Sequence, residues 1–173
     1  MNKSFFTLIF TVLCVLFLFF GCKDEELLLS KIPYTGNEIR IDGYYYLQEN
    51  KQTWIRFFYR DGVILVFNFG FPITNLDAVD AKIAEEYEKY KNDKLSWGVF
   101  SVAGSVIQYS KWGPSVGGGL TSNKCMGTIE NDTTFRLIKA LYYTGRIDDF
   151  NDNERYYFRQ FSPKPDSTNN FIK

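Results

Sequence analysis

Short runs of aromatic and β-branched residues recur along this chain and alternate with polar turns. Aromatic residues make up 18% of the sequence, and these residue types prefer the half-buried faces of β-strands. The sharpest turn signal is Asp61-Gly62, because a tight hairpin needs a positive φ that glycine adopts freely. The pattern predicts eight strands, over residues 38–47, 53–59, 63–69, 96–102, 105–112, 125–130, 133–141 and 155–161.

One segment has the periodicity of a helix. Within residues 76–91, apolar side chains recur at spacings of three and four and form one stripe. Thr74 or Asn75 can cap the first turn, and Asp77 and Asp80 suit the positive end of the helix dipole. We expect this helix to cover a barrel mouth or one face of a sheet. A helix that binds a partner protein is the alternative.

Sequential antiparallel strands leave exposed edges, and closure into a barrel is the usual way to remove them. The sequence therefore predicts a mainly β (α+β) domain, in which an eight-strand antiparallel meander closes into a small barrel with one helix. We expect Phe57, Phe67 and Phe100 to fill the barrel if it has no cavity. Residues 113–124 are rich in glycine and serine and are expected to form a mobile loop. An open antiparallel sheet packed on the helix is the alternative fold.

The amino terminus has the layout of a secretory signal. Lys3 precedes an apolar run over residues 5–20, which is short for a membrane-spanning helix of about 20 residues. The run ends at Gly21-Cys22, which resembles the lipobox of bacterial lipoproteins, although Phe19-Phe20 is bulkier than the residues usual there. The resemblance implies cleavage before Cys22 and attachment of lipid, including palmitate-like acyl chains, to this cysteine. Two or more such chains hold a protein stably on a membrane.

The residues after the cysteine indicate which membrane is involved. Lys23 stands where aspartate would signal retention in the inner membrane, so the outer membrane is favoured. Lys23-Asp24-Glu25-Glu26 resembles the short acidic export signal of surface lipoproteins of Bacteroidota, which favours surface display over a periplasm-facing position. The expected organisation is a signal peptide (1–21), a lipidated tether (22–36), one β-rich domain (37–161) and a disordered tail (162–173).

A second resemblance concerns the domain itself. An Asp-Gly hairpin, then a Gly-aromatic strand, then a final strand pair resemble the small lipocalin-like lipoproteins of Bacteroidota. The resemblance implies a lipocalin-like barrel, and the helix near 76–91 departs from it by interrupting the meander. The motifs are Tyr59-Arg60-Asp61-Gly62, Trp97-Gly98-Val99-Phe100 with Gly104 and Ile107, and Gly127-Thr128-Ile129 before Asn131-Asp132-Thr133-Thr134-Phe135.

Residue types that are missing exclude several functions. The chain has no histidine, which removes Ser-His-Asp and Cys-His catalysis. Its 20 basic and 20 acidic residues cancel, so bulk charge offers nothing to nucleic acid. Cys125 is the only cysteine after Cys22, and a neighbouring lysine on a strand points to the opposite face, so we interpret Cys125 as a small core residue.

Four aromatic residues are candidates to line a pocket for an apolar ligand or a sugar ring: Trp54, Trp97, Tyr109 and Trp112. No cofactor or metal is expected. Asp149, Asn151 and Asn153 match the start of a calcium loop, but the later ligand positions do not match.

Two short motifs, Asp132-Thr133-Thr134 and Asp166-Ser167-Thr168, resemble the O-glycosylation sequence of Bacteroidota and predict modification at Thr133 and Ser167.

The sequence predicts a lipid-anchored envelope lipoprotein that is not an enzyme and binds a small apolar or glycan ligand. The alternative is a structural or protein-interaction module with a solid core, whose partner is another envelope protein. An enzyme ranks third, because the chain has no catalytic motif.

Overall fold

The computed structural model describes residues 24–49, 52–72, 75–115, 118–150 and 154–173. The predicted signal peptide and the lipidation site Cys22 lie outside these residues. The described part contains β1 (Gly43–Glu49), β2 (Gln52–Phe58), β3 (Val63–Phe69), α2 (Leu76–Lys91), the 3-10 helix η1 (Lys94–Ser96), β4 (Trp97–Ala103), β5 (Val106–Pro114), β6 (Leu120–Asn131), β7 (Thr134–Leu141), β8 (Ile147–Asp149) and β9 (Arg155–Gln160).

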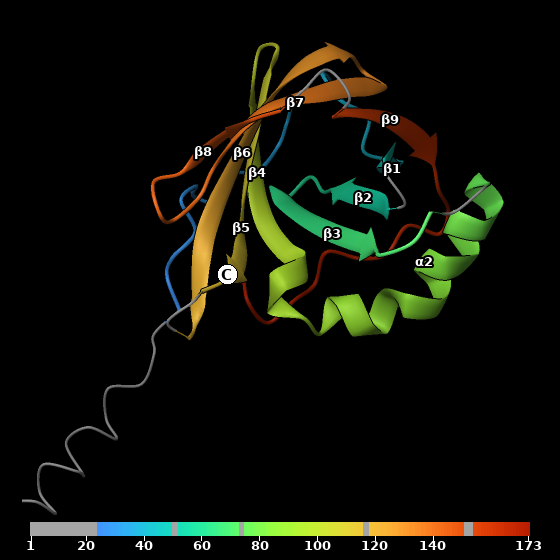
Figure 1. Ribbon diagram of the computed structural model, residues 1–173. Helices are drawn as coiled ribbons and strands as arrows, with labels where there is room; N and C mark the ends of the chain where they lie inside the picture. The colour runs from blue at the N-terminus through green and yellow to red at the C-terminus, as the bar shows by residue number, and fades with distance from the viewer. Residues whose placement is uncertain (1–23, 50–51, 73–74, 116–117, 151–153) are drawn as a thin grey trace, which may run out of the picture.

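Eight of these strands form a closed antiparallel ring (Figure 1). Strands β1 to β7 pair in chain order, and β9 closes the ring by pairing with β7 on one side and β1 on the other. The short strand β8 pairs with the end of β7. The predicted small, lipocalin-like barrel is confirmed, and the alternative of an open sheet is wrong.

The expected mobile loop at 113–124 is mostly strand. Gly113-Pro114 ends β5, and residues 120–124 begin β6, where Leu120 pairs with Pro114 and Lys124 pairs with Leu141. The two strand ends pair with each other, and Asp24 and Glu25 supply further hydrogen-bond partners for Leu120 and Ser122, even though the sequence of this segment does not alternate. Tertiary context therefore decides its structure, as is common for strands.

The sheet buries both of its faces, and alternate residues of each strand enter different hydrophobic cores. The inner core fills part of the barrel, and the outer core lies under α2 and the chain ends. Phe100 lies inside as expected, whereas Phe57 and Phe67 lie in the outer core. The main inner residues are Tyr45, Leu47, Phe58, Ile64, Val66, Phe100, Ile107, Tyr109, Phe135, Leu137 and Tyr156.

Helix α2 covers the outer face of the barrel beside β3 (Figure 1). Asn75 caps it by accepting a 2.7 Å hydrogen bond from the backbone N–H of Ala78. Val79 and Ile83 are fully buried in the outer core. Arg159 of β9 pairs with Asp77 and with Asp80 at the start of the helix. The helix thus covers a sheet face, which is one of the two positions expected from the sequence. None of the helices in the described residues is long and apolar enough to cross a membrane.

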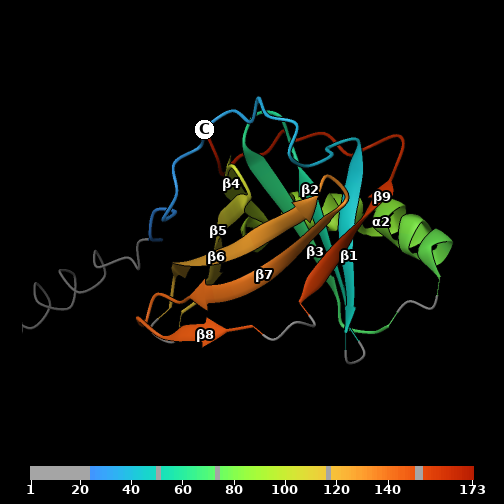
Figure 2. The same cartoon turned by 90° about the horizontal axis from the view of Figure 1, so that it is seen from above.

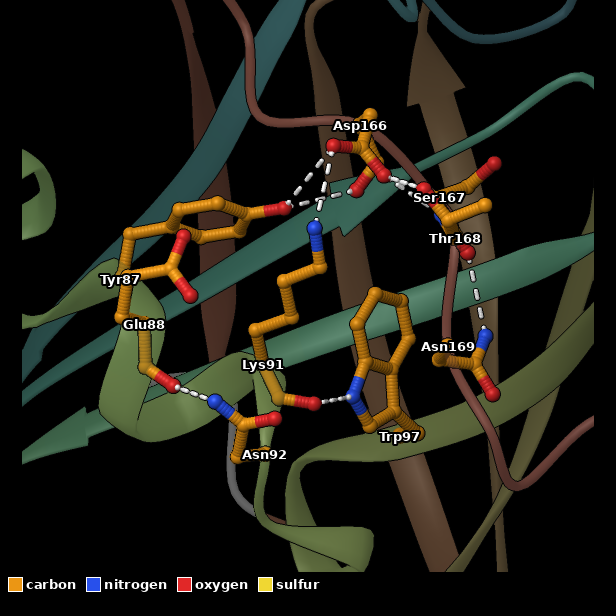
Figure 3. Close-up of polar contacts among 9 residues, drawn as sticks. All are labelled: Tyr87, Glu88, Lys91, Asn92, Trp97, Asp166, Ser167, Thr168 and Asn169. Atoms are coloured by element: carbon orange, nitrogen blue, oxygen red, sulfur yellow. Dashed lines mark hydrogen bonds and ion pairs between the residues drawn. The ribbon is translucent and has the colours of Figure 1, made fainter.

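The predicted disordered tail is wrong, because residues 162–173 pack on the barrel and the helix. Asp166 accepts hydrogen bonds from Tyr87 and Lys91 of α2 (Figure 3). Phe171 and Ile172 pack against the outer core. The segment is mostly polar, but burial of its two apolar residues Phe171 and Ile172 offsets the entropy cost of ordering it.

The described part of the predicted tether, residues 24–36, packs on the barrel. The backbone N–H of Glu25 donates to the carbonyl of Leu120 at the start of β6. Farther along the segment, Leu27 packs against the outer core and Tyr34 is buried in the inner core. Figure 2 shows the segment before β1 running along the barrel towards that strand.

We expect Ile83→Ala to lower the free energy of unfolding by about 2–5 kcal/mol, because it removes buried apolar volume and leaves a cavity beneath α2. Urea denaturation would measure the loss. Glu88→Ala is the control, since Glu88 is exposed on the same helix. Equal stability of the two variants would contradict the assignment of α2 to the outer core.

Lys164, in the tail after β9, makes the stability of the fold depend on pH. Its ammonium donates to the carbonyls of Ile41 and Phe58 at 2.6 Å, and burial lowers its pKa from 10.5 to about 8. Between these two values the unfolded chain binds more protons than the folded chain, so the contribution of Lys164 to stability rises with pH. The stability of the wild type relative to Lys164→Met should rise by about 1–3 kcal/mol from pH 7.5 to 10. A flat difference in urea denaturation across this range would contradict it.

Candidate functional site

One end of the barrel is closed by the chain that precedes β1. This end carries the turns β2–β3, β4–β5 and β6–β7, because the connections of an antiparallel meander alternate between ends. The N–H of Tyr34 donates to the carbonyl of Arg60 in the first of these turns, and Arg40 donates to the carbonyl of Asp132 in the last. Tyr34 and Ile39 are buried between these contacts. Residues 34–40 therefore plug this closed end.

The opposite end is open and leads into a cavity of about 490 Å³. The lining residues come from β2, β5, β6, β7 and β9, and from the connections at this end. The described residues around the cavity are Gln52, Trp54, Arg56, Tyr109, Lys111, Gly113, Pro114, Asn123, Cys125, Leu137, Ala140, Tyr142, Phe150, Glu154 and Tyr156.

Strand direction gives the depth of each lining residue. Along β2 the inward positions run from Gln52 at the mouth through Trp54 to Arg56, and Phe58 beyond them belongs to the packed half. Tyr109 of β5 and Tyr156 of β9 are buried beside the guanidinium of Arg56. The open half of the barrel therefore ends in a floor made by one arginine and two tyrosines.

Arg56 is held by aromatic rings. Its guanidinium carbon lies 5.4, 5.6 and 5.2 Å from the ring centroids of Trp54, Tyr109 and Tyr156. One Nη donates to the carbonyl of Ile55 and the other donates to the hydroxyl of Tyr156, both at 3.1 Å. Its Nε is buried and has no hydrogen-bond partner among the described residues. Cation–π contacts stabilise such a cation by about 0.5–2 kcal/mol each.

The electrostatics of the pocket are positive at its floor. Burial raises the pKa of Tyr109 well above its ordinary value, and burial also raises the pKa of the Cys125 thiol, so both groups are neutral near pH 7. Burial, followed by repulsion from Arg56, lowers the pKa of Lys111. The Lys111 ammonium donates to the carbonyl of Trp112 at 3.2 Å. Glu154 is the acid among the described lining residues.

The structure brings together two of the four aromatic residues predicted for a ligand pocket. Trp54 and Tyr109 line the cavity. Trp97 and Trp112 lie in the outer core, and the Trp97 indole N–H donates to the carbonyl of Lys91 in α2 at 2.8 Å. The period of two explains the error, since Trp112 is three positions from Tyr109 on β5 and so faces the other way.

Sequence reasoning missed the charged lining residues. Arg56 lies in Thr53-Trp54-Ile55-Arg56-Phe57-Phe58, where it shares one face with Trp54 and Phe58. A charged residue on the inward face of an otherwise apolar strand was the available signal, because arginine is rarely buried unless it is paired. Lys111 follows Tyr109 at the same spacing on β5.

Cys125 lies in the cavity wall, pairs across the ladder with Ala140, and is the free cysteine of the described residues. The calcium motif falls partly on Asn151 and Asn153, which lie outside the described residues. Within the described ranges no cluster of acidic or cysteine side chains is arranged to hold a metal.

The two predicted glycosylation residues are both half-buried and hydrogen-bonded. Thr133 donates to the side chain of Asn131 at 2.7 Å, and Ser167 donates to Asp61 at 3.2 Å. Ser167 belongs to the tail segment beside α2 (Figure 3), which was expected to be disordered and therefore accessible. Modification at these residues stays a prediction.

Comparisons with protein-family models, with curated proteins and with solved structures gave no match for this chain. The interpretation of the pocket therefore depends on its own geometry and chemistry.

Trp97→Ala should lower the free energy of unfolding by about 3–5 kcal/mol, because Trp97 is fully buried and hydrogen-bonded to α2. Trp54→Ala should cost less than about 2 kcal/mol, since Trp54 already borders a cavity. Urea denaturation of both variants measures the difference. Similar losses would contradict the division of these residues between a packed core and a pocket.

Proposed function

We propose that this chain is a lipid-anchored envelope lipoprotein that is not an enzyme and binds a small, mainly apolar ligand in the open half of its barrel. The observation that carries the proposal is the cavity of about 490 Å³, which is within the size range of small-molecule sites. Its walls are mainly aromatic and aliphatic, with Trp54, Leu137 and Phe150 among them. A few polar groups at the floor can orient a ligand.

The path of residues 24–28 supports a membrane-facing pocket. The carboxylate of Asp24 accepts a hydrogen bond from the N–H of Leu120 and pairs with Lys94. Leu120 is the ladder partner of Pro114, which lines the cavity, so this segment begins at the open end of the barrel. Cys22 is two residues earlier, a reach of at most about 7 Å. A lipid on Cys22 would therefore hold the mouth of the pocket close to the bilayer.

This geometry favours one of the earlier hypotheses over the others. A structural or interaction module with a solid core would not contain an open cavity of this size. A glycan ligand is less favoured than an apolar one, because most of the surface that lines the cavity is apolar. The outer membrane and surface display remain part of the proposal through the residues after Cys22.

The pocket proposal is tested with a neutral apolar dye, N-phenyl-1-naphthylamine, whose fluorescence rises in apolar surroundings. The full chain held in phospholipid nanodiscs should bind the dye above the level of empty nanodiscs. Ala140→Trp should abolish this excess, because Ala140 is buried in the cavity wall. Ala103→Trp, which adds the same side chain at an exposed position, should retain it. Equal dye binding by both variants would overturn the proposal.

The anchor is tested by mass spectrometry of the protein extracted from membranes of the native cell. We expect the mature chain to begin at an acylated Cys22, and Cys22→Ala to remain uncleaved. An unmodified amino terminus at another position would overturn the lipoprotein assignment and leave the pocket test unaffected.

A further inference from the structure

Arg56 is an unpaired cation in the interior of the barrel. Only 4% of its surface is exposed, and no acid among the described residues forms an ion pair with it. Within the described ranges its Nε has no hydrogen-bond partner, and its two Nη groups donate to neutral acceptors, the carbonyl of Ile55 and the hydroxyl of Tyr156. Burying a charge without a counter-ion costs several kcal/mol, so this arginine is present at the expense of stability.

The surroundings of Arg56 do not supply the missing negative charge. Tyr109 and Cys125 stay protonated because burial raises the pKa of each group. Lys111 adds a second cation to the same cavity, and its ammonium contacts backbone carbonyls. Glu154 lies nearer the mouth, one inward position before Tyr156 on the way into the barrel. The described lining residues therefore carry two cations against one acid.

We propose that the ligand is an amphiphile with a single carboxylate, which enters head first and places that carboxylate against the guanidinium of Arg56. This inference depends on the proposed function and names its ligand class. The apolar chain of the ligand lies between Trp54, Leu137 and Phe150 on the way to the mouth. The mouth faces the bilayer in the proposed orientation, and the bilayer is where such amphiphiles concentrate.

A carboxylate fits this floor better than other head groups. The guanidinium is planar and presents its donors as a fork, which matches the two oxygens of a carboxylate. A phosphate dianion would need a second strong donor at the floor, and Lys111 is held towards the mouth by the carbonyls of Leu95 and Trp112. A neutral ligand would leave the charge of Arg56 without compensation, and a cationic ligand would be repelled.

The test compares three probes with one ten-carbon chain and different heads: decanoate, decanol and decyltrimethylammonium. Each probe is titrated against the neutral dye bound to the full chain in nanodiscs, and equilibrium dialysis gives the free concentration of each probe. We expect the wild type to prefer decanoate. Arg56→Met should lower the affinity for decanoate about 10–100-fold, because it removes one hydrogen-bonded contact between charged groups. The affinities for the dye and for decanol should change less than about threefold.

Two further measurements separate a ligand contact from a structural role. Lys139→Met removes one exposed positive charge outside the cavity and should leave the affinity for decanoate unchanged. Arg56→Met should unfold in urea at the same denaturant concentration as the wild type or higher, because an apolar side chain replaces an unpaired buried charge. Unchanged decanoate affinity in Arg56→Met with intact dye binding would overturn the carboxylate proposal alone. Loss of dye binding in a folded Arg56→Met would also overturn it, by showing that Arg56 shapes the pocket.

Discussion

Backbone pairing of β9 with both β7 and β1 is the interaction on which the rest of this structure depends. It joins residues 155–160 to a strand that begins more than a hundred positions earlier, and it closes the ring of strands. A closed ring has no free edges, so its inward residues face one another around a common interior. Without this closure the open half of the barrel would be a sheet surface, and the pocket would not exist.

Closure also explains why the outer face is covered. The outward residues of β1 to β5 are as apolar as the inward ones, and a bare surface of this kind would invite aggregation. Helix α2, the segment before β1 and the tail after β9 bury it together. The ion pairs between Arg159 and the start of α2 fix the helix to the last strand. Because the outer core also stabilises the fold, the fold tolerates a cavity in the inner core.

The two ends of the barrel have different properties for a physical reason. Residues 34–40 plug one end, where their backbone groups find partners in the turns. The inner aromatic cluster, including Phe58, Phe100 and Phe135, fills the half below this plug. At the other end, Arg56 interrupts the apolar packing, because burying its charge against aliphatic groups would cost free energy. Proteins retain such locally destabilising groups mainly at functional sites.

Much of the architecture could be predicted from the local pattern. The eight barrel strands, the Asp61-Gly62 hairpin with Gly62 at a φ of 84°, and the helix over residues 76–91 all follow from periodicity and turn chemistry. These features depend on interactions between near neighbours, so the sequence contains them directly. The ordered packing of the segments before β1 and after β9 was not predictable in this way. Their packing is decided by a sheet face that exists only after folding.

The candidate site divides along the same line. The sequence by itself determined that this chain is β-rich, lacks histidine chemistry, and carries aromatic residues of the kind that line pockets, including Trp54 and Tyr109. Only the tertiary structure decided which aromatic residues meet. Alternation along β5 separates Trp112 from Tyr109, but only the register of the strands in the closed ring decided which face of each strand is inward and brought Arg56, Lys111 and Tyr156 together. Register and closure are set by contacts between distant segments, which no local window of residues contains.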